Sequence, residues 1–143
     1  MFIGEYQHAT DDKGRLAIPA KFRATLGVRA IVTRGLDHCL FLFSVADWEE
    51  LAKKIAALPL VQAHSRAFSR LMLAGAMDVD LDSQGRILVP DYLRRYAMIE
   101  KQTIVAGLYN RIEIWNDDAW KKYKEQTESH SDDIAEKLTE LGI

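Results

Sequence analysis

The distribution of apolar and polar residues predicts a chain of short strands and short helices. Residues 77–82 alternate strictly between apolar residues and aspartates, as expected for a strand with one buried face. Residues 2–10 carry Phe2, Ile3 and Tyr6 among polar neighbours and predict an opening strand. A helical stripe follows Ser44, a suitable N-cap, and comprises Trp48, Leu51, Ala52, Ile55 and Leu58. Together these patterns predict a mixed α/β fold.

One nine-residue segment occurs twice. Asp11-Asp-Lys-Gly-Arg-Leu-Ala-Ile-Pro19 returns as Asp82-Ser-Gln-Gly-Arg-Ile-Leu-Val-Pro90, with an offset of seventy-one residues. The similarity continues beyond the proline with one inserted residue, through pairs that include Gly35 with Gly107 and Trp48 with Trp120. Two units are too few for a solenoid. We therefore expect two halves that clasp each other about a pseudo-twofold axis.

The repeat divides the chain into four expected parts. The first unit covers about residues 5–58 and the second about residues 77–129. Residues 59–76 connect them, and we expect a helix over residues 60–74 after Pro59. Residues 130–143 form an acidic tail with a short terminal helix, on which Ile134, Leu138 and Leu141 share one face. Each unit then has the order strand–turn–strand–helix–strand–strand–helix.

The repeated segment has the composition of a tight turn between two strands. Gly14 and Gly85 tolerate positive φ at the turn, and Asp11 and Asp82 can accept hydrogen bonds from its N–H groups. Each aspartate lies across the turn from an arginine, close enough to form an ion pair. The apolar residues 16–18 and 87–89 predict buried strands. The segments end on prolines suited to the first position of a helix, Pro19 and Pro90.

Composition narrows the function classes. No apolar run approaches the length of a membrane span, and residues at the N-terminus lack signal-peptide features, so we expect a cytosolic protein. The single cysteine, Cys39, lies in an apolar run and is expected to be a small buried hydrophobe. The four histidines have no metal-ligand spacing, and no nucleophile elbow or phosphate-binding loop occurs. We therefore predict no enzymatic activity, metal or cofactor.

The charge distribution leaves room for an acidic ligand. The formal net charge is −2, but residues 1–116 carry fifteen Lys and Arg against thirteen Asp and Glu. Around the first turn the basic residues are Lys13, Arg15, Lys21 and Arg23, and the second copy has Gln84, Arg86, Arg94 and Arg95. An arginine can brace the hairpin against its aspartate, or it can bind a phosphate or a guanine edge through its planar fork. The residues alone favour these two interpretations equally.

A resemblance to known proteins favours the second interpretation. The Asp-x-x-Gly-Arg element, followed by three apolar residues and Pro, resembles the AbrB-type swapped-hairpin DNA-binding module. Two copies, opening with Met1-Phe2-x-Gly4 and with Asp47-Trp48-Glu49 after the first, are similar to the MraZ family of bacterial regulators. The similarity runs from Met1 to about Trp120, with Asp11 and Arg15, and Asp82 and Arg86, intact.

This resemblance implies a DNA-binding regulator without catalytic function or cofactor. It implies a pseudo-symmetric β-rich barrel flanked by helices, ring-like homo-oligomers in the nucleoid, and repression of a division and cell-wall gene cluster through direct repeats upstream of it. Arg15 and Arg86 are the expected main contacts, with Lys13 beside them. The remaining candidates are Gln84, Lys21, Arg23 and Arg94. The alternative is a non-catalytic ring-forming scaffold or an antitoxin-like module that binds another protein.

Overall fold

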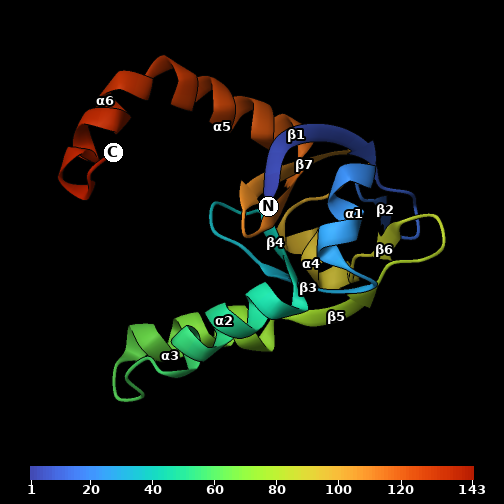
Figure 1. The fold of residues 1–143 in the computed structure, drawn as a ribbon, viewed down its shortest axis with the longest axis horizontal. Coiled ribbons are helices and arrows are strands. Elements are labelled where there is room, and N and C mark those ends of the chain that lie inside the picture. Colours follow the sequence, from blue (N-terminus) through green and yellow to red (C-terminus); the bar gives the residue numbers. More distant parts are fainter.

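Eight strands form a six-stranded sheet and a separate two-stranded ribbon in the computed structural model, which describes residues 1–143 (Figure 1). The sheet contains β1 (Phe2–Ala9), β3 (Arg29–Arg34), β4 (Leu40–Ser44), β5 (Met77–Asp80), β7 (Gln102–Tyr109) and β8 (Ile112–Asn116), in the order β1-β7-β8-β4-β3-β5. The ribbon pairs β2 (Arg15–Ala17) with β6 (Arg86–Leu88). All pairings are antiparallel.

The strand order has the internal symmetry of the sequence repeat. Exchanging β1 with β5, β3 with β7, and β4 with β8 leaves the order of the sheet unchanged when it is traced from the other edge. Each opening strand pairs with the opposite half: β1 pairs with β7, and β5 pairs with β3. The ribbon also takes one strand from each half. The expected clasped, β-rich α/β arrangement is therefore confirmed, whereas the AbrB-type barrel and the domain boundaries stay predictions.

Helices follow the strands at equivalent places in the two halves. They are α1 (Ala20–Leu26), α2 (Val45–Ala56), α3 (Ala63–Ser69), α4 (Asp91–Tyr96), α5 (Asp117–Ser129) and α6 (Ser131–Lys137). Pro19 and Pro90 immediately precede α1 and α4, one position earlier than expected, with extended ψ values of 133° and 145°. Ser44 caps α2 as predicted, because its side chain accepts a hydrogen bond from the Asp47 N–H.

The connection between the halves is not one regular helix. The sequence predicts a helix over residues 60–74, but α3 starts only at Ala63 and continues into a π-helical turn, η1 (Arg70–Ala74). A π turn displaces backbone carbonyls from the regular α-helical ladder. Two carbonyls here accept bonds from β3: Thr33 Oγ1 donates to the Met72 oxygen at 2.7 Å. Arg34 Nη1 donates to the Leu71 oxygen at 3.3 Å.

Apolar side chains from both halves build one main core. Leu16, Ile18, Ile87 and Val89 are fully buried in it, together with side chains from α1, α4 and the sheet. The prediction that residues 87–89 are all buried is wrong for Leu88, which is 56% exposed because it points to the opposite face of the ribbon. Both halves contribute to the same core, so neither can bury its apolar face alone.

Outside this core, Cys39 is fully buried, which confirms the expected small hydrophobe. Its thiol donates to the Leu36 carbonyl at 3.1 Å. Burial, with a smaller effect from the nearby Glu113 carboxylate, raises the pKa of the Cys39 thiol far above its ordinary value. A thiol that stays protonated is a poor nucleophile, so Cys39 has a packing role.

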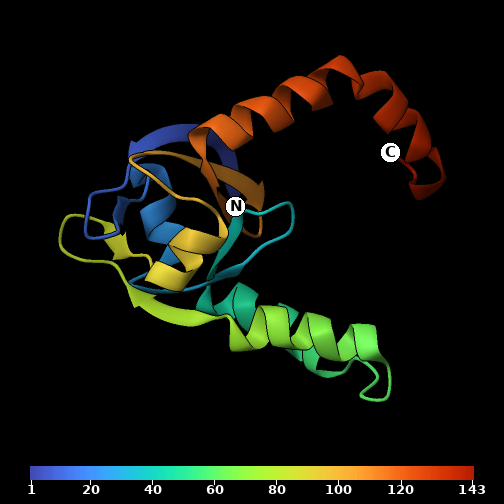
Figure 2. The same ribbon diagram turned by 180° about the vertical axis from the view of Figure 1, so that it is seen from behind.

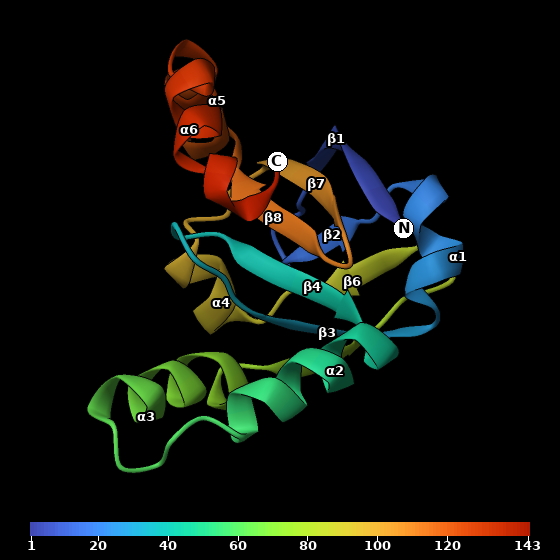
Figure 3. The same ribbon diagram turned by 60° about the vertical axis from the view of Figure 1, so that its left-hand side comes forward.

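Two helical arms project from one end of the molecule, and the repeated turns lie at the other end (Figures 1 and 2). One arm is α2 with α3, and the other is α5 with α6 and the short 3-10 turn η2 (Thr139–Leu141); Figure 3 shows them on different sides of the body. Glu5 of β1 anchors α5, since its carboxylate accepts bonds from Trp120 Nε1 and Lys124 Nζ, both at 2.8 Å. No helix is both long and apolar enough to span a bilayer.

Candidate nucleic-acid interface

The first repeated turn is held by a single aspartate. Asp11 Oδ1 accepts the N–H groups of Lys13 at 3.0 Å and of Arg15 at 2.9 Å. Its other oxygen, Oδ2, accepts Nε–H of Arg15 at 2.7 Å. Gly14 has φ of 88°, which explains the requirement for glycine at this position of the turn. The carboxylate thus fixes both the backbone of the turn and the direction of the arginine side chain.

The second turn repeats these bonds atom for atom. Asp82 Oδ1 accepts the N–H groups of Gln84 and Arg86, each at 2.9 Å, and Oδ2 accepts Nε–H of Arg86 at 2.9 Å. Gly85 also has positive φ, of 74°. The predicted turn chemistry, including both Asp–Arg pairs, is confirmed. The sequence could predict these turn hydrogen bonds because every group involved in one turn lies within five consecutive residues.

These bonds change the acidity of the two turn carboxylates. The backbone N–H of Arg15, with smaller effects from its guanidinium and the Lys13 N–H, lowers the pKa of Asp11 below its ordinary value. The same groups of Arg86 and Gln84 lower the pKa of Asp82. Both carboxylates are therefore ionised at neutral pH, and each remains an acceptor for its arginine.

The two turns are joined through the ribbon. Arg15 lies opposite Leu88, and Ala17 lies opposite Arg86. Beyond the ladder, the Ile18 N–H donates to the Gly85 carbonyl and the Val89 N–H to the Gly14 carbonyl, each at 2.9 Å. Each turn is therefore hydrogen-bonded to the strand that leaves the other turn, which sets the spacing between the two arginines.

Alternation along the ribbon places both arginines on one face. Leu16 and Ile87 point into the core and are fully buried. Arg15 and Arg86 lie on the opposite face, because cross-strand partners share a face and alternate residues do so too. Their side chains are 37% and 29% exposed. Each guanidinium uses only Nε within the protein, so Nη1 and Nη2 remain free to donate.

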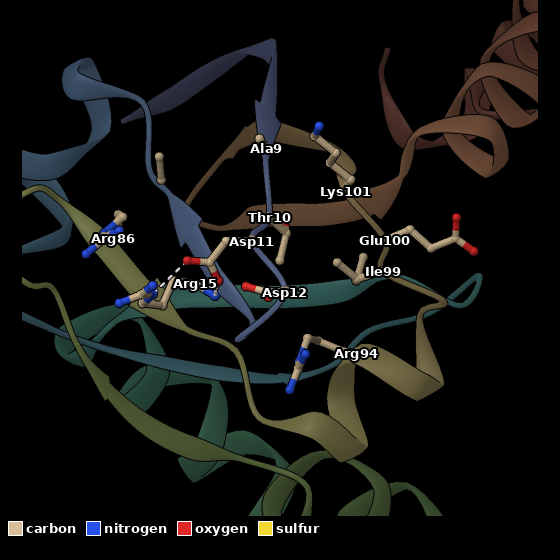
Figure 4. A pocket seen from close by; sticks show the side chains of 11 residues that line it. Ala9, Thr10, Asp11, Asp12, Arg15, Arg86, Arg94, Ile99, Glu100 and Lys101 are labelled. Carbon is tan, nitrogen blue, oxygen red and sulfur yellow. Dashed lines mark hydrogen bonds and ion pairs between the residues drawn. The ribbon is translucent and has the colours of Figure 1, made fainter.

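An open hollow of about 570 Å³ lies beside this face (Figure 4). Its charged lining residues are Arg15, Arg86, Arg94, Lys101, Asp11, Asp12 and Glu100. Figure 4 shows Arg15 and Arg86 to the left of the hollow, Lys101 at its upper right and Arg94 at its lower right. Sequence analysis missed Lys101, which lies on the loop before β7, because nothing in the repeat marks that position. A second, smaller hollow of about 370 Å³ is lined by Arg23 and the second turn.

Arg23 and Arg94, two of the predicted contacts, have internal partners. Arg23 Nε donates to the Ile18 carbonyl at 2.8 Å, and Arg94 Nε donates to the Val89 carbonyl at 3.0 Å. Each guanidinium lies against the turn glycine of the opposite half, so that a methyl group on Gly85 or Gly14 would overlap it. These arginines therefore support the turns, whatever else their remaining N–H groups contact.

The other predicted contacts lie around the turns. Lys13 and Gln84 are exposed at the tips, and their side chains form no hydrogen bond or ion pair within the protein. Lys21, on α1, has its ammonium 5.6 Å from the centre of the Tyr6 ring and 6.0 Å from that of Phe22. These distances fit cation–π contacts. No group of three or more His, Cys, Asp or Glu side chains is arranged to hold a metal ion.

Comparison with known proteins decides the family. A family model described as "MraZ protein, putative antitoxin-like" matches residues 1–71 and again residues 72–141. The chain belongs to the MraZ family. The "Transcriptional regulator MraZ" of Alkaliphilus metalliredigens is 48% identical over 143 residues, with both chains fully covered. Proteins of the same name from Alkaliphilus oremlandii and Moorella thermoacetica are 49% and 46% identical, also over the full length of both chains.

The two matched segments divide the chain at the same repeat that the strand order displays. The family resemblance expected from the Asp-x-x-Gly-Arg motifs is therefore confirmed. The names of the relatives support a role in the regulation of transcription, which is not a class of enzyme. No name among these relatives states how DNA is contacted or which residues contact it.

Proposed function

We propose that this protein binds double-stranded DNA through the outer face of the β2/β6 ribbon and thereby regulates transcription. The observation that carries the proposal is the pair of guanidinium groups, Arg15 and Arg86, on one face with free Nη atoms. A free guanidinium edge can donate two hydrogen bonds to a phosphate or to O6 and N7 of guanine. The major groove of B-DNA is about 12 Å wide and admits a two-stranded ribbon.

In this mechanism the turn aspartates orient the arginines before DNA arrives. A side chain that is already held in its bound conformation loses less conformational entropy on binding. Lys13 and Lys101 neutralise phosphates and release counterions, which gives sequence-independent affinity. Arg15 and Arg86 then contact base edges. Gln84 can contact a base or a phosphate as a neutral donor, so the first turn contributes more to electrostatic attraction than the second.

The proposed function includes assembly, because one protomer has few basic side chains with which to bind the DNA phosphates. The formal net charge is −2. A ring-like homo-oligomer that presents one ribbon per protomer to direct repeats in the DNA gains affinity through effective concentration. The helical arms project away from the ribbon (Figure 1), so we expect the ribbon to stay accessible in such an assembly. We propose that the sites are direct repeats upstream of its own division and cell-wall gene cluster, that binding represses the cluster, and that the protein acts in the nucleoid.

The test is a titration with a labelled duplex from the region upstream of its own gene, beside a random duplex of equal length. Arg15→Ala and Arg86→Ala should each weaken binding to the upstream duplex about tenfold to hundredfold. Their thermal unfolding should change little, because a solvent-accessible ion pair contributes little to stability. Arg70→Ala, which removes an exposed arginine from η1, is the matched control and should bind normally.

The rival is the protein-binding role suggested by the words "putative antitoxin-like" in the family description. Under that hypothesis Arg15 and Arg86 serve only to brace their turns. The wild-type protein would then fail to distinguish the upstream duplex from random DNA. Unchanged affinity of Arg15→Ala and Arg86→Ala at every salt concentration would also refute the ribbon as the DNA-binding surface.

A further inference from the structure

The outer face of the ribbon carries one large apolar side chain, Leu88, beside the two arginines. The four residues on this face are Arg15, Ala17, Arg86 and Leu88. Leu88 is 56% exposed, whereas its neighbours Ile87 and Val89 are fully buried. A single exposed leucine needs no explanation by itself. Its position does, because it lies directly opposite Arg15 on the surface that the proposed function places against DNA.

Leu88 makes the two ends of the ribbon chemically different. Ala17 occupies the equivalent position in the first repeat and lies opposite Arg86. One end of the ribbon therefore pairs a guanidinium with an isobutyl group, and the other pairs a guanidinium with a methyl group. Directly opposite residues have Cβ atoms about 4.5–5.5 Å apart, so the two groups at each end can contact neighbouring base pairs.

The major groove offers one apolar partner for such a side chain. Thymine is the only unmodified base of DNA that presents a methyl group there. We propose that Leu88 is a specificity-determining residue that packs on the 5-methyl group of a thymine next to the base pair contacted by Arg15. Ala17 ends in a single methyl group and is partly buried, so it offers less apolar surface for an equivalent contact at the other end. This inference rests on the proposed function and adds which base the leucine selects.

The contact predicts a measurable preference for thymine over deoxyuridine, which differs only by that methyl group. Burial of one methyl group corresponds to about a threefold to fivefold change in Kd. The probe is the duplex from the region upstream of the gene, with each thymine replaced singly by deoxyuridine. The full-length wild-type protein should lose about threefold to fivefold in affinity at one thymine per bound ribbon.

Leu88→Ala should bind the all-thymine duplex more weakly by a similar factor and should no longer distinguish thymine from deoxyuridine at that position. The variant should fold normally because the side chain is exposed. Val28→Ala, which shortens an 83% exposed apolar residue outside the ribbon, is the matched control and should keep the discrimination. Ala17→Leu should create a second deoxyuridine-sensitive position, at the other end of the site.

The outcomes separate this inference from the function on which it rests. If the wild-type protein forms no sequence-specific complex with the upstream duplex, the proposed function fails. If it forms one that is insensitive to every deoxyuridine, or whose sensitivity survives Leu88→Ala, only the role of Leu88 is refuted. A changed sedimentation coefficient of Leu88→Ala, with unchanged thymine discrimination, would assign the leucine to a contact between copies of the chain instead.

Discussion

At the scale of single residues, the two arginines that contact each turn glycine or turn aspartate have different roles. Arg15 and Arg86 use only Nε within the protein and lie on the outer face of the ribbon. Arg23 and Arg94 also donate Nε to a carbonyl of their own half, but their guanidinium groups cover the turn glycine of the other half. A charged donor bonded to a backbone carbonyl contributes about 1.5–3 kcal/mol. Arg23 and Arg94 should therefore matter for stability, and Arg15 and Arg86 for binding.

A double-mutant cycle tests the contact between Arg23 and Gly85. Gly85→Ala should destabilise the protein by about 2–4 kcal/mol, since the methyl group adds positive-φ strain and overlaps the guanidinium. In an Arg23→Ala background the overlap is gone, and the same substitution should cost only the strain, about 1–2 kcal/mol. The free energies of unfolding come from urea titrations of the four proteins.

The control for this cycle is Gly27→Ala. Gly27 has a similar φ of 84°, but an added methyl group would meet no atom within 4 Å. Its effect should therefore add to that of Arg23→Ala without coupling. Equal costs of Gly85→Ala in both backgrounds would show that the guanidinium does not rest on the second turn.

At the scale of elements, the two turns share a backbone and differ in their side chains. Their aspartate bonds, positive-φ glycines and arginines are the same. The tips differ, because Lys13 of the first turn corresponds to Gln84 of the second. A difference in binding between the halves must therefore come from side chains and not from turn geometry.

An exchange of the tip residues measures this difference. Lys13→Gln should lower the slope of log K against log salt by about one, the value expected for the loss of one phosphate contact. Gln84→Lys should raise the slope if the second tip also faces a phosphate. The double variant Lys13→Gln/Gln84→Lys has the wild-type net charge, and we expect it to bind about as tightly as wild type, because the larger contribution of the first tip comes from its lysine and moves with it. Weaker binding of the double variant would show that the two tips are not equivalent.

Sequence could predict the elements and the turn chemistry, because both depend on neighbouring residues. The Asp11–Arg15 bond, the α2 cap at Ser44 and the strands of both halves are local in this sense. The position of Leu88 was missed because the apolar run 87–89 hides the alternation that Arg86 begins. The contact of Arg23 with Gly85 was missed because it joins the two halves, and no local pattern reports the distance between them.

At the scale of the whole molecule, the clasp makes the halves mutually dependent. All eight residues of β1 pair with β7, and β2 pairs only with β6 and, through Leu16, with Thr10. The main core mixes Leu16, Ile18 and Phe22 with Ile87 and Leu93. A separated half would expose this apolar surface and the strand edges that pair with the other half, which favour association with another chain.

A chain of residues 1–71 should therefore not form a folded monomer. We expect it to associate as a homodimer in which β1 of each copy pairs with β3 of the other, by analogy with the β5–β3 pairing of the full chain. Mixed with residues 72–143, it should form a heterodimer with a higher melting temperature, because the native pairs of β1 with β7 and of β2 with β6 are restored. Light scattering after size-exclusion chromatography gives the mass of each species, and circular dichroism gives its melting temperature. A cooperatively folded monomer of residues 1–71 at micromolar concentration would contradict the mutual dependence of the two halves.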